Sequence, residues 1–285
     1  MADGLTASST LTMADGVYPL PGYTRRTIGS AELVARDNVF DELALAVRKH
    51  GTLYAWARGQ QQSRALSGRA PVYVAAIADK SQTTVVVRHA WHGGMLAPIT
   101  GDRFLRPTRA PLELMRSHML RECGIPTPEV VAFALYPAGP ALARVDVATR
   151  YVPDSFDLAV VLAGTVPDIT REQAFNAIDV LLPQLARNGF IHPDLNVKNI
   201  LLHRDGVKTV ATVLDVDVMV WDQHLAPVTI TQRNAERLLR SLIKARRQFG
   251  VSFTDSERDG FVDRALAELP DEIRARHKAA GGASH

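Results

Sequence analysis

Three polar side chains are spaced along the chain in a way that could support the transfer of a phosphoryl group. Asp194 and Asn199 lie on one short polar stretch between two apolar runs, and Asp215 follows a turn and a further apolar run. A carboxylate in the position of Asp194 can accept the proton of a substrate hydroxyl. Asn199 and Asp215 offer oxygen atoms, which suit a Mg²⁺ ion that phosphates already hold. This pattern predicts a general base beside a magnesium site.

The residues around these side chains strengthen that interpretation. Positions 192–199 read H-P-D-L-N-V-K-N, which matches the H-x-D-L-x-x-x-N order of a kinase catalytic loop. Asn196 stands where protein kinases usually carry a lysine, so part of the charge stabilisation must come from elsewhere. We assign Asp194 and Asn196 to catalysis. The alternative is a strand–turn–strand with Asp and Asn in its loops by chance, but five residues in register, followed by Asp215, favour the catalytic loop.

A kinase also needs a cation that holds the α- and β-phosphates, and an acidic partner that positions it. No lysine lies between Lys80 and Lys198, and Lys80 falls in a turn. Arg88, near the end of an apolar strand pattern, is therefore the candidate, with Glu113 of the following helix as its partner. An exposed strand arginine, and an exposed acid favoured by the helix dipole, are the alternatives. Gly68 could let the backbone cover the phosphates, although an ordinary turn explains one glycine equally well.

The composition favours a globular protein of two lobes. The chain has 285 residues, which is longer than a typical single domain. Hydrophobic residues make up 46% of it, which is ample for a core. A net charge of +3 argues against bulk binding of nucleic acid. Cys123 is the single cysteine, so we expect a reducing compartment such as the cytoplasm. The start lacks a secretory pattern, and the longest apolar stretch, 130–143, contains prolines that prevent one spanning helix.

The periodicity predicts an α+β chain with the two lobes of a protein-kinase-like fold. We expect flexible tails at 1–20 and 277–285, an amino lobe at 21–152 and a mostly helical carboxy lobe at 153–276. The amino lobe should hold a small antiparallel sheet and one long helix at 110–122. Strand patterns occur at 71–77, 83–89, 130–135 and 141–151, and further helix patterns at 41–58, 157–162, 171–188, 232–247 and 255–269.

The helix predicted at 232–247 carries a basic stripe. Its basic residues recur at spacings of three or four, and leucine and isoleucine residues form the apolar side. Such a stripe could contact an anionic membrane or an acidic sugar, and each basic group near an anionic surface contributes about 1 kcal/mol. A solvated face on a packed helix is an equally good explanation. The stripe consists of Arg233, Arg237, Arg240, Lys244 and Arg247.

Four blocks of the sequence resemble the family of Kdo kinases and lipopolysaccharide kinases. They are V-V-R-H at 86–89 with Gly93-Gly94, Glu113 with G-I-P-T-P at 124–128, the catalytic loop with L-D-V-D at 214–217, and N-A-E-R-L-L-R-S-L-I-K at 234–244. The D-L-N variant of the loop and the last block are specific to this family. The H-x-D frame is shared by all kinase-like enzymes.

This resemblance implies an activity and its partners. The family phosphorylates an inner-core sugar of lipid A, so the expected reaction transfers phosphate from ATP, with Mg²⁺, to a Kdo hydroxyl of a lipid-linked precursor. By the resemblance, Asp194 would be the base, and Asn199 and Asp215 would be the magnesium ligands. Arg88 with Glu113 would hold the phosphates, and the backbone near Tyr151 and Val152 would meet adenine. The expected location is cytoplasmic, with peripheral contact at the cytoplasmic face of the inner membrane.

Two other functions stay open at this point. A kinase of the same fold could act on a protein Ser/Thr or on a small alcohol, although Asn196 and the lack of an A-P-E segment after Asp215 count against a protein kinase. A pseudokinase could serve as a binding module. The presence of all three polar residues of the motif counts against a pseudokinase.

Overall fold

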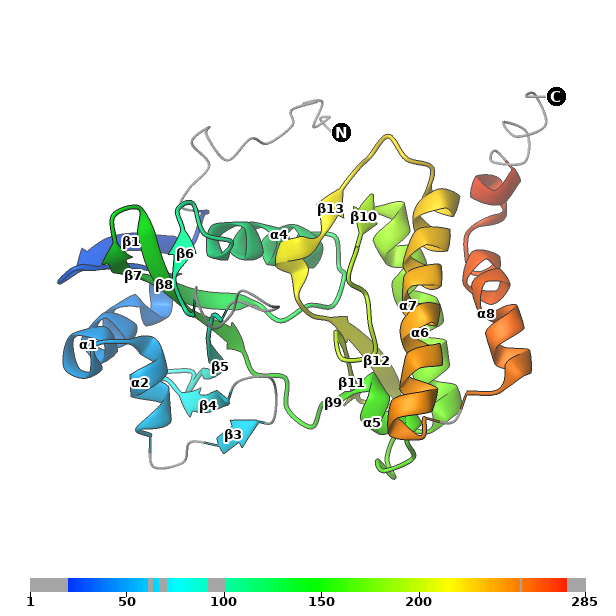
Figure 1. Cartoon of the computed structure of the whole chain (residues 1–285), viewed down its shortest axis with the longest axis horizontal. Coiled ribbons are helices and arrows are strands. Elements are labelled where there is room, and N and C mark those ends of the chain that lie inside the picture. The colour runs from blue at the N-terminus through cyan, green and yellow to red at the C-terminus, as the bar shows by residue number, and fades with distance from the viewer. Residues whose placement is uncertain (1–19, 61–63, 67–70, 92–100, 252, 276–285) are drawn as a thin grey trace.

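The computed structural model describes residues 20–60, 64–66, 71–91, 101–251 and 253–275. Figure 1 shows a sheet with its helices beside a second, largely helical part. The two groups of elements meet near residues 151–155, and we keep the predicted lobe boundary there as a proposal. Except for Leu20, the predicted tails lie outside the described residues. The predicted α+β class is confirmed.

One antiparallel sheet forms the amino lobe. Its strands follow the order β1-β2-β7-β8-β5-β4-β3, and the short β6 pairs with β8. The patterns predicted β4, β5, β7 and β8, but they missed β1 and β2, whose charged residues interrupt the apolar alternation. The strands are β1 Tyr23–Ile28, β2 Ala31–Arg36, β3 Arg64–Leu66, β4 Val72–Ala76, β5 Thr84–His89, β6 Phe104–Leu105, β7 Val130–Gly139 and β8 Leu142–Arg150.

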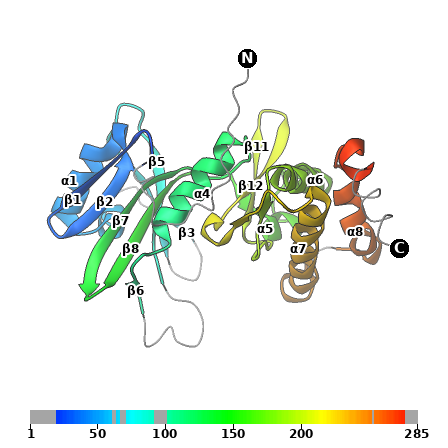
Figure 2. The same cartoon turned by 90° about the horizontal axis from the view of Figure 1, so that it is seen from above.

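Helices cover both faces of this sheet. Because side chains alternate along a strand, Ala132 and Ala134 of β7 pack toward α1 (Phe40–His50) and α2 (Leu53–Arg58), whereas Phe133 and Leu135 pack toward α4 (Ala110–Glu122). Figure 2 shows α4 lying between the sheet and the carboxy lobe. This helix therefore connects the sheet mechanically to the lobe that carries the catalytic loop.

The single helix predicted at 41–58 is wrong, because the chain forms two helices there. They are α1 (Phe40–His50) and α2 (Leu53–Arg58). Gly51 interrupts the pattern with a φ of 80°, a conformation that residues other than glycine rarely adopt. The Thr52 hydroxyl then accepts a hydrogen bond from the Ala55 N–H and begins the second helix.

In the part of the carboxy lobe that the structure describes, long and short helices pack around the catalytic loop. The helices are α5 Leu158–Leu162, α6 Arg171–Arg187, α7 Pro227–Phe249 and α8 Asp255–Ala267. The short strands are β9 Phe156–Asp157, β10 Phe190–Ile191, β11 Ile200–Asp205, β12 Lys208–Val213 and β13 Val220–Trp221. Apolar side chains of all four helices share one core with β11 and β12. Only α7 departs from its predicted bounds by more than two residues, because it begins at Pro227.

Gly189 lets the chain turn sharply from α6 into β10, just before the catalytic loop. Its φ is +77°, and a Cβ atom there would lie 2.8 Å from the carbonyl oxygen of Asp222. We expect Gly189→Ala to lower the free energy of unfolding by more than about 1 kcal/mol, measured by urea denaturation. Gly206→Ala is the control, because Gly206 has a φ of +58° with open space around it. A loss in Gly189→Ala no larger than in the control would contradict the steric explanation.

Candidate functional site

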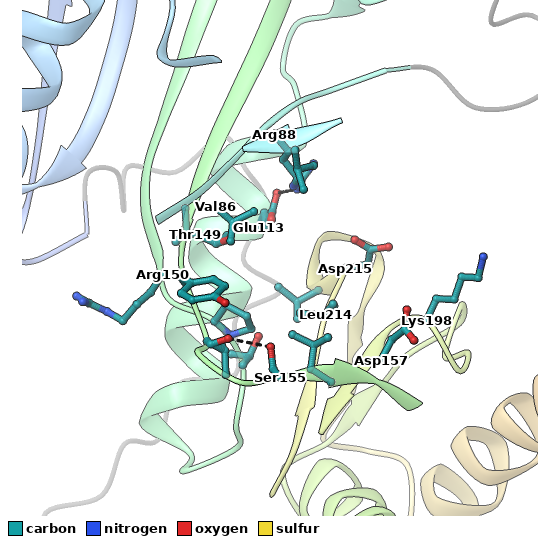
Figure 3. Close-up of a pocket in the computed structure, with 18 of the residues that line it drawn as sticks. Val86, Arg88, Glu113, Thr149, Arg150, Ser155, Asp157, Lys198, Leu214 and Asp215 are labelled. Atoms are coloured by element: carbon teal, nitrogen blue, oxygen red, sulfur yellow. Dashed lines mark hydrogen bonds and ion pairs between the residues drawn. The ribbon is translucent and has the colours of Figure 1, made fainter. Parts of the chain in front are cut away.

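A cleft of about 460 Å³ lies between the sheet and the carboxy lobe. Figure 3 shows Val86 of β5 facing Leu214, which follows β12, across this cleft. Tyr151 and Val152, which by the family resemblance would meet adenine, line the cleft where the chain leaves β8. Apolar walls from two lobes, closed at one end by backbone, suit a flat aromatic base.

Arg88 and Glu113 form an ion pair at the other end of the cleft. The Arg88 Nη2 donates to Glu113 Oε2. Arg88 lies on β5 and Glu113 on α4, and the two residues are 25 positions apart in the sequence. The Glu113 carboxylate raises the pKa of Arg88, and burial raises the pKa of Glu113, which the positive charge of Arg88 opposes. The side chain of Arg88 keeps 33% of its surface exposed, so it still faces the cleft. A cation held in this way can bind phosphate oxygens.

The side chain of Asp194 is 58% exposed, and Arg237 of α7 binds it. The Arg237 Nη2 lies 2.5 Å from Asp194 Oδ1, and its Nε donates to the carbonyl oxygen of Pro193 at 2.9 Å. One guanidinium therefore fixes both the backbone and the carboxylate of the loop. Such a two-point contact restricts the carboxylate to one orientation.

Two other residues of α7 bind the same loop. Asn234 accepts from the His192 N–H at 2.9 Å and donates to the carbonyl oxygen of Phe190 at 3.0 Å. The Ser241 Oγ accepts from the Val197 N–H at 3.1 Å. With Arg237, these residues stand three and four positions apart, so they share one helix face. Helix α7 is thus the support on which the catalytic loop is built.

Asn199 and Asp215 have the chemistry of a magnesium site. The Asn199 Nδ2 donates to the carbonyl oxygen of Asp194 at 3.0 Å, which leaves the Asn199 Oδ1 as the acceptor of that amide. The Leu214 N–H donates to the Asn199 carbonyl oxygen at 2.9 Å, which places Asp215 beside Asn199. Among the described residues no three His, Cys, Asp or Glu form a metal-binding group. Two oxygen ligands suit Mg²⁺, because that ion usually keeps phosphate and water ligands as well.

His192 joins these residues from within the core. Its side chain Nε2 lies 2.9 Å from the Leu214 carbonyl oxygen, to which a neutral ring can donate. Burial lowers the pKa of His192, while that hydrogen bond and the carboxylates of Asp215, Asp194 and Asp217 act in the opposite direction. His192 therefore links the segment that leads to Asp215 to the loop of Asp194.

The structure brings most of the predicted site residues together. Arg88, Glu113, Tyr151, Val152 and Asp215 line the cleft, and Asn199 contacts the loop carbonyl of Asp194. Gly68 lies outside the described residues. The roles assigned to these residues stay predictions.

Asn196 bonds within the loop itself. Its Nδ2 donates to the Asp194 carbonyl oxygen at 2.9 Å, and its Oδ1 accepts from the Lys198 N–H at 2.9 Å. These bonds indicate a part in shaping the loop. The predicted part in catalysis stays a prediction.

Sequence reasoning missed two basic residues at the site. Lys198 lines the cleft, and Figure 3 shows its side chain near Asp157. Its place inside the loop motif was the signal that could have identified it. Arg237 was assigned to a basic stripe, and only its contact with Asp194 separates it from Arg233, Arg240, Lys244 and Arg247, which are exposed.

Comparisons with known proteins agree on one family. A model of the lipopolysaccharide kinase (Kdo/WaaP) family matches residues 56–263. A 3-deoxy-D-manno-octulosonic acid kinase of Actinobacillus succinogenes is 25% identical over 206 residues, which cover 71% of this chain and 83% of the relative. A protein of the same name from Xylella fastidiosa strain M23 is 30% identical over 183 residues, covering 61% of this chain and 68% of the relative.

Two solved structures also resemble the chain. WaaP in complex with acyl carrier protein is 16% identical, with a TM-score of 0.46, and the match covers 78% of this chain and 84% of that one. The Rio2 kinase of Chaetomium thermophilum is 21% identical, with a TM-score of 0.45, and the match covers 93% of this chain and 78% of that one. The family match, together with the two-lobed α+β architecture, confirms the predicted protein-kinase-like fold.

Proposed function

Because the chain belongs to the lipopolysaccharide kinase (Kdo/WaaP) family, we propose that it transfers phosphate from ATP to a hydroxyl of the Kdo sugar on a lipid A precursor. One observation carries this proposal. The Arg88–Glu113 pair and Asp215 come from separate elements and line one cleft, whose floor continues into the loop of Asp194. Relatives named 3-deoxy-D-manno-octulosonic acid kinase support the choice of acceptor.

In this proposal, each part of ATP meets a different set of residues around the cleft. Adenine lies between Val86 and Leu214 and meets the backbone at Tyr151 and Val152. Arg88, held by Glu113, binds the phosphates nearer the loop. Asn199 and Asp215 would hold a magnesium ion, which would neutralise charge on the phosphates. The sequence resemblance and the positions of these residues support this arrangement, because all but Asn199 line the cleft and the Asn199 carbonyl oxygen accepts from the Leu214 N–H.

Asp194 acts on the acceptor. The acceptor oxygen attacks the γ-phosphorus, the bond from that phosphorus to the bridging oxygen of ADP breaks, and Asp194 receives the hydroxyl proton. Arg237 keeps the carboxylate in position through its two hydrogen bonds to the loop. Lys198, which lines the cleft, adds positive charge where the phosphates lie. Alignment and charge account for the catalysis, as phosphoryl transfer requires.

Arg237 supports turnover through Asp194 rather than through ATP. We expect Arg237→Gln to lower kcat by more than about tenfold with little change in the KM for ATP, because a misplaced base affects the reacting geometry. Arg237→Lys should recover only part of kcat, since lysine cannot bind the Pro193 carbonyl and Asp194 with one planar group. Steady-state kinetics with detergent-solubilised acceptor measures both.

Arg240→Gln is the matched control, because Arg240 lies on the same helix and is exposed. Its kinetics in detergent should equal those of the wild type. A loss of kcat in Arg237→Gln that does not exceed the loss in this control contradicts the positioning role.

The acceptor is tested by competition. Labelled ATP is offered to the protein with purified Kdo-lipid A, a generic protein substrate and water in one reaction. Label in the lipid fraction alone supports the proposal. Label mainly in the protein substrate identifies a protein kinase, and release of phosphate alone identifies a hydrolase. Binding of ATP without any transfer would leave a pseudokinase.

We also infer a cytoplasmic site of action at the surface of the inner membrane. Arg233, Arg240, Lys244 and Arg247 are exposed along α7, and each contributes about 1 kcal/mol near an anionic surface. Within the described part of the chain, no helix is both long and apolar enough to cross a membrane. Co-sedimentation with anionic and with neutral vesicles at low and high salt tests this contact.

A further inference from the structure

A second cavity of about 1050 Å³ adjoins the ATP cleft. Val72, Arg88, Glu113 and Asp215 line both spaces, so the two are continuous at the position where the phosphates lie. We call this space the front cavity. It is defined by Trp91, Phe104, Thr108, Arg109, Val145 and Asp217, which do not line the ATP cleft.

Thr108 places an unsatisfied hydroxyl in the wall of the front cavity. The residue is 4% exposed, and its Oγ1 has no hydrogen-bond partner among the described residues. A buried hydroxyl without a partner is unfavourable relative to a satisfied one. Because Thr108 lines the cavity, rotation of its side chain would bring this hydroxyl to a ligand that supplies the missing partner.

Arg109 and Asp217 add a planar polar pair. Their side chains approach to 3.6 Å between Arg109 Nη1 and Asp217 Oδ2, and 74% and 18% of their surfaces are exposed. A guanidinium has five N–H donors and a carboxylate has several acceptor sites, so this one contact leaves both able to bind neighbouring hydroxyls. Hydroxyl groups on adjacent carbons of a sugar present the matching donors and acceptors.

Trp91 supplies an apolar surface at the same cavity. Its side chain is 55% exposed although tryptophan is usually well buried, and its ring packs edge-on against His89 at 5.3 Å between centroids. One broad face of an aromatic ring can cover the C–H face of a pyranose. A hydroxyl, a planar charged pair and an aromatic face are together the groups that a sugar ring needs.

We propose that the front cavity is the acceptor subsite and binds the sugar ring through Thr108, the Arg109–Asp217 pair and Trp91. This inference rests on the proposed kinase function and adds the place where the acceptor binds. Asp217 stands two residues after Asp215, so a ring bound to it lies beside the metal end of the cleft. One ring hydroxyl then faces the phosphate and Asp194, while the lipid extends from the open side of the cavity.

Thr108→Val is the most informative variant, because it removes the hydroxyl and keeps the shape. Since the hydroxyl has no partner among the described residues, the melting temperature of the free protein should stay unchanged or rise. The KM for Kdo-lipid A should increase by about tenfold, while the KM for ATP stays constant. Thr209→Val is the matched control. Its Oγ1 also lacks a partner among the described residues, but Thr209 lines neither space, so its KM values should not change.

Direct binding separates this inference from the proposed function. Free Kdo and the neutral methyl glucoside are titrated into the wild type, Trp91→Leu, Arg109→Gln and the two Thr variants by calorimetry, with magnesium and a non-hydrolysable ATP analogue present. Saturable binding that is lost in Trp91→Leu and Thr108→Val supports the subsite even if Kdo-lipid A is not phosphorylated. If Arg109→Gln loses binding of Kdo alone, Arg109 binds the carboxylate of Kdo. If it loses binding of both sugars equally, Arg109 binds their hydroxyl groups.

Two results overturn the inference while leaving the kinase reaction intact. One is an unchanged KM for Kdo-lipid A in Trp91→Leu, Arg109→Gln and Thr108→Val. The other is binding of neither sugar by a wild-type protein that still responds to ATP. If Kdo-lipid A receives no phosphate although a sugar binds in the cavity, the proposed acceptor is wrong and the subsite stands.

Discussion

Asp194→Asn is expected to abolish phosphoryl transfer while leaving the binding of ATP nearly intact. A positioned general base contributes about 10²–10⁴-fold to rate, and an amide cannot take up the proton of the acceptor hydroxyl. The substitution keeps the shape of the side chain and an oxygen that can accept from Arg237, so the loop should keep its conformation. The ATP-dependent rise in melting temperature should therefore match that of the wild type, while labelled phosphate no longer reaches the lipid.

The control for this variant is Asp205→Asn. Asp205 is the exposed last residue of β11 and lies outside the cleft, so transfer should be unaffected. Wild-type activity in Asp194→Asn would remove this residue from the mechanism. Loss of the ATP response together with activity would instead show that the substitution disturbs the whole site.

Asp215→Asn, unlike Asp194→Asn, is expected to weaken the binding of ATP itself. The substitution keeps one oxygen but removes the negative charge that holds the cation most strongly, so the stabilisation by ATP with Mg²⁺ should fall well below that of the wild type. That stabilisation is about 2.7 kcal/mol at a ligand concentration of about 100 times Kd. Asparagine is preferred to alanine here because Asp215 has a φ of 53°, which asparagine tolerates much better. Thermal unfolding with and without Mg²⁺ measures the change.

Two observations would locate the error if this expectation fails. An ATP-dependent rise that persists unchanged in Asp215→Asn means that Asp215 is not a metal ligand. A fall in the melting temperature of the ligand-free variant would instead point to a structural role. Comparison with Asp194→Asn separates binding from chemistry, because the two aspartates should fail at different steps.

The strands and helices that local patterns predicted well are those with strong periodicity. The helix predicted at 110–122 is observed with the same bounds, and β4 and β5 lie within their predicted segments. Strands β1 and β2 were missed, since their residues become strand only by pairing with each other and with β7. Helix 41–58 was overextended, because its periodicity does not register the turn at Gly51.

The amino-acid sequence by itself indicated the chemistry of this protein: a loop with a carboxylate, an amide and a following aspartate in the order typical of phosphoryl transfer. Only the tertiary structure decided which distant residues complete it. Arg237 stands 43 residues from Asp194, and Arg109 is still further along the chain from Asp217, yet each pair is in contact. The spacing of residues in the sequence shows which side chains lie together on one helix or loop. Which distant side chains reach the site depends on how α7 packs against the loop of Asp194 and how α4 packs against the segment after Asp215.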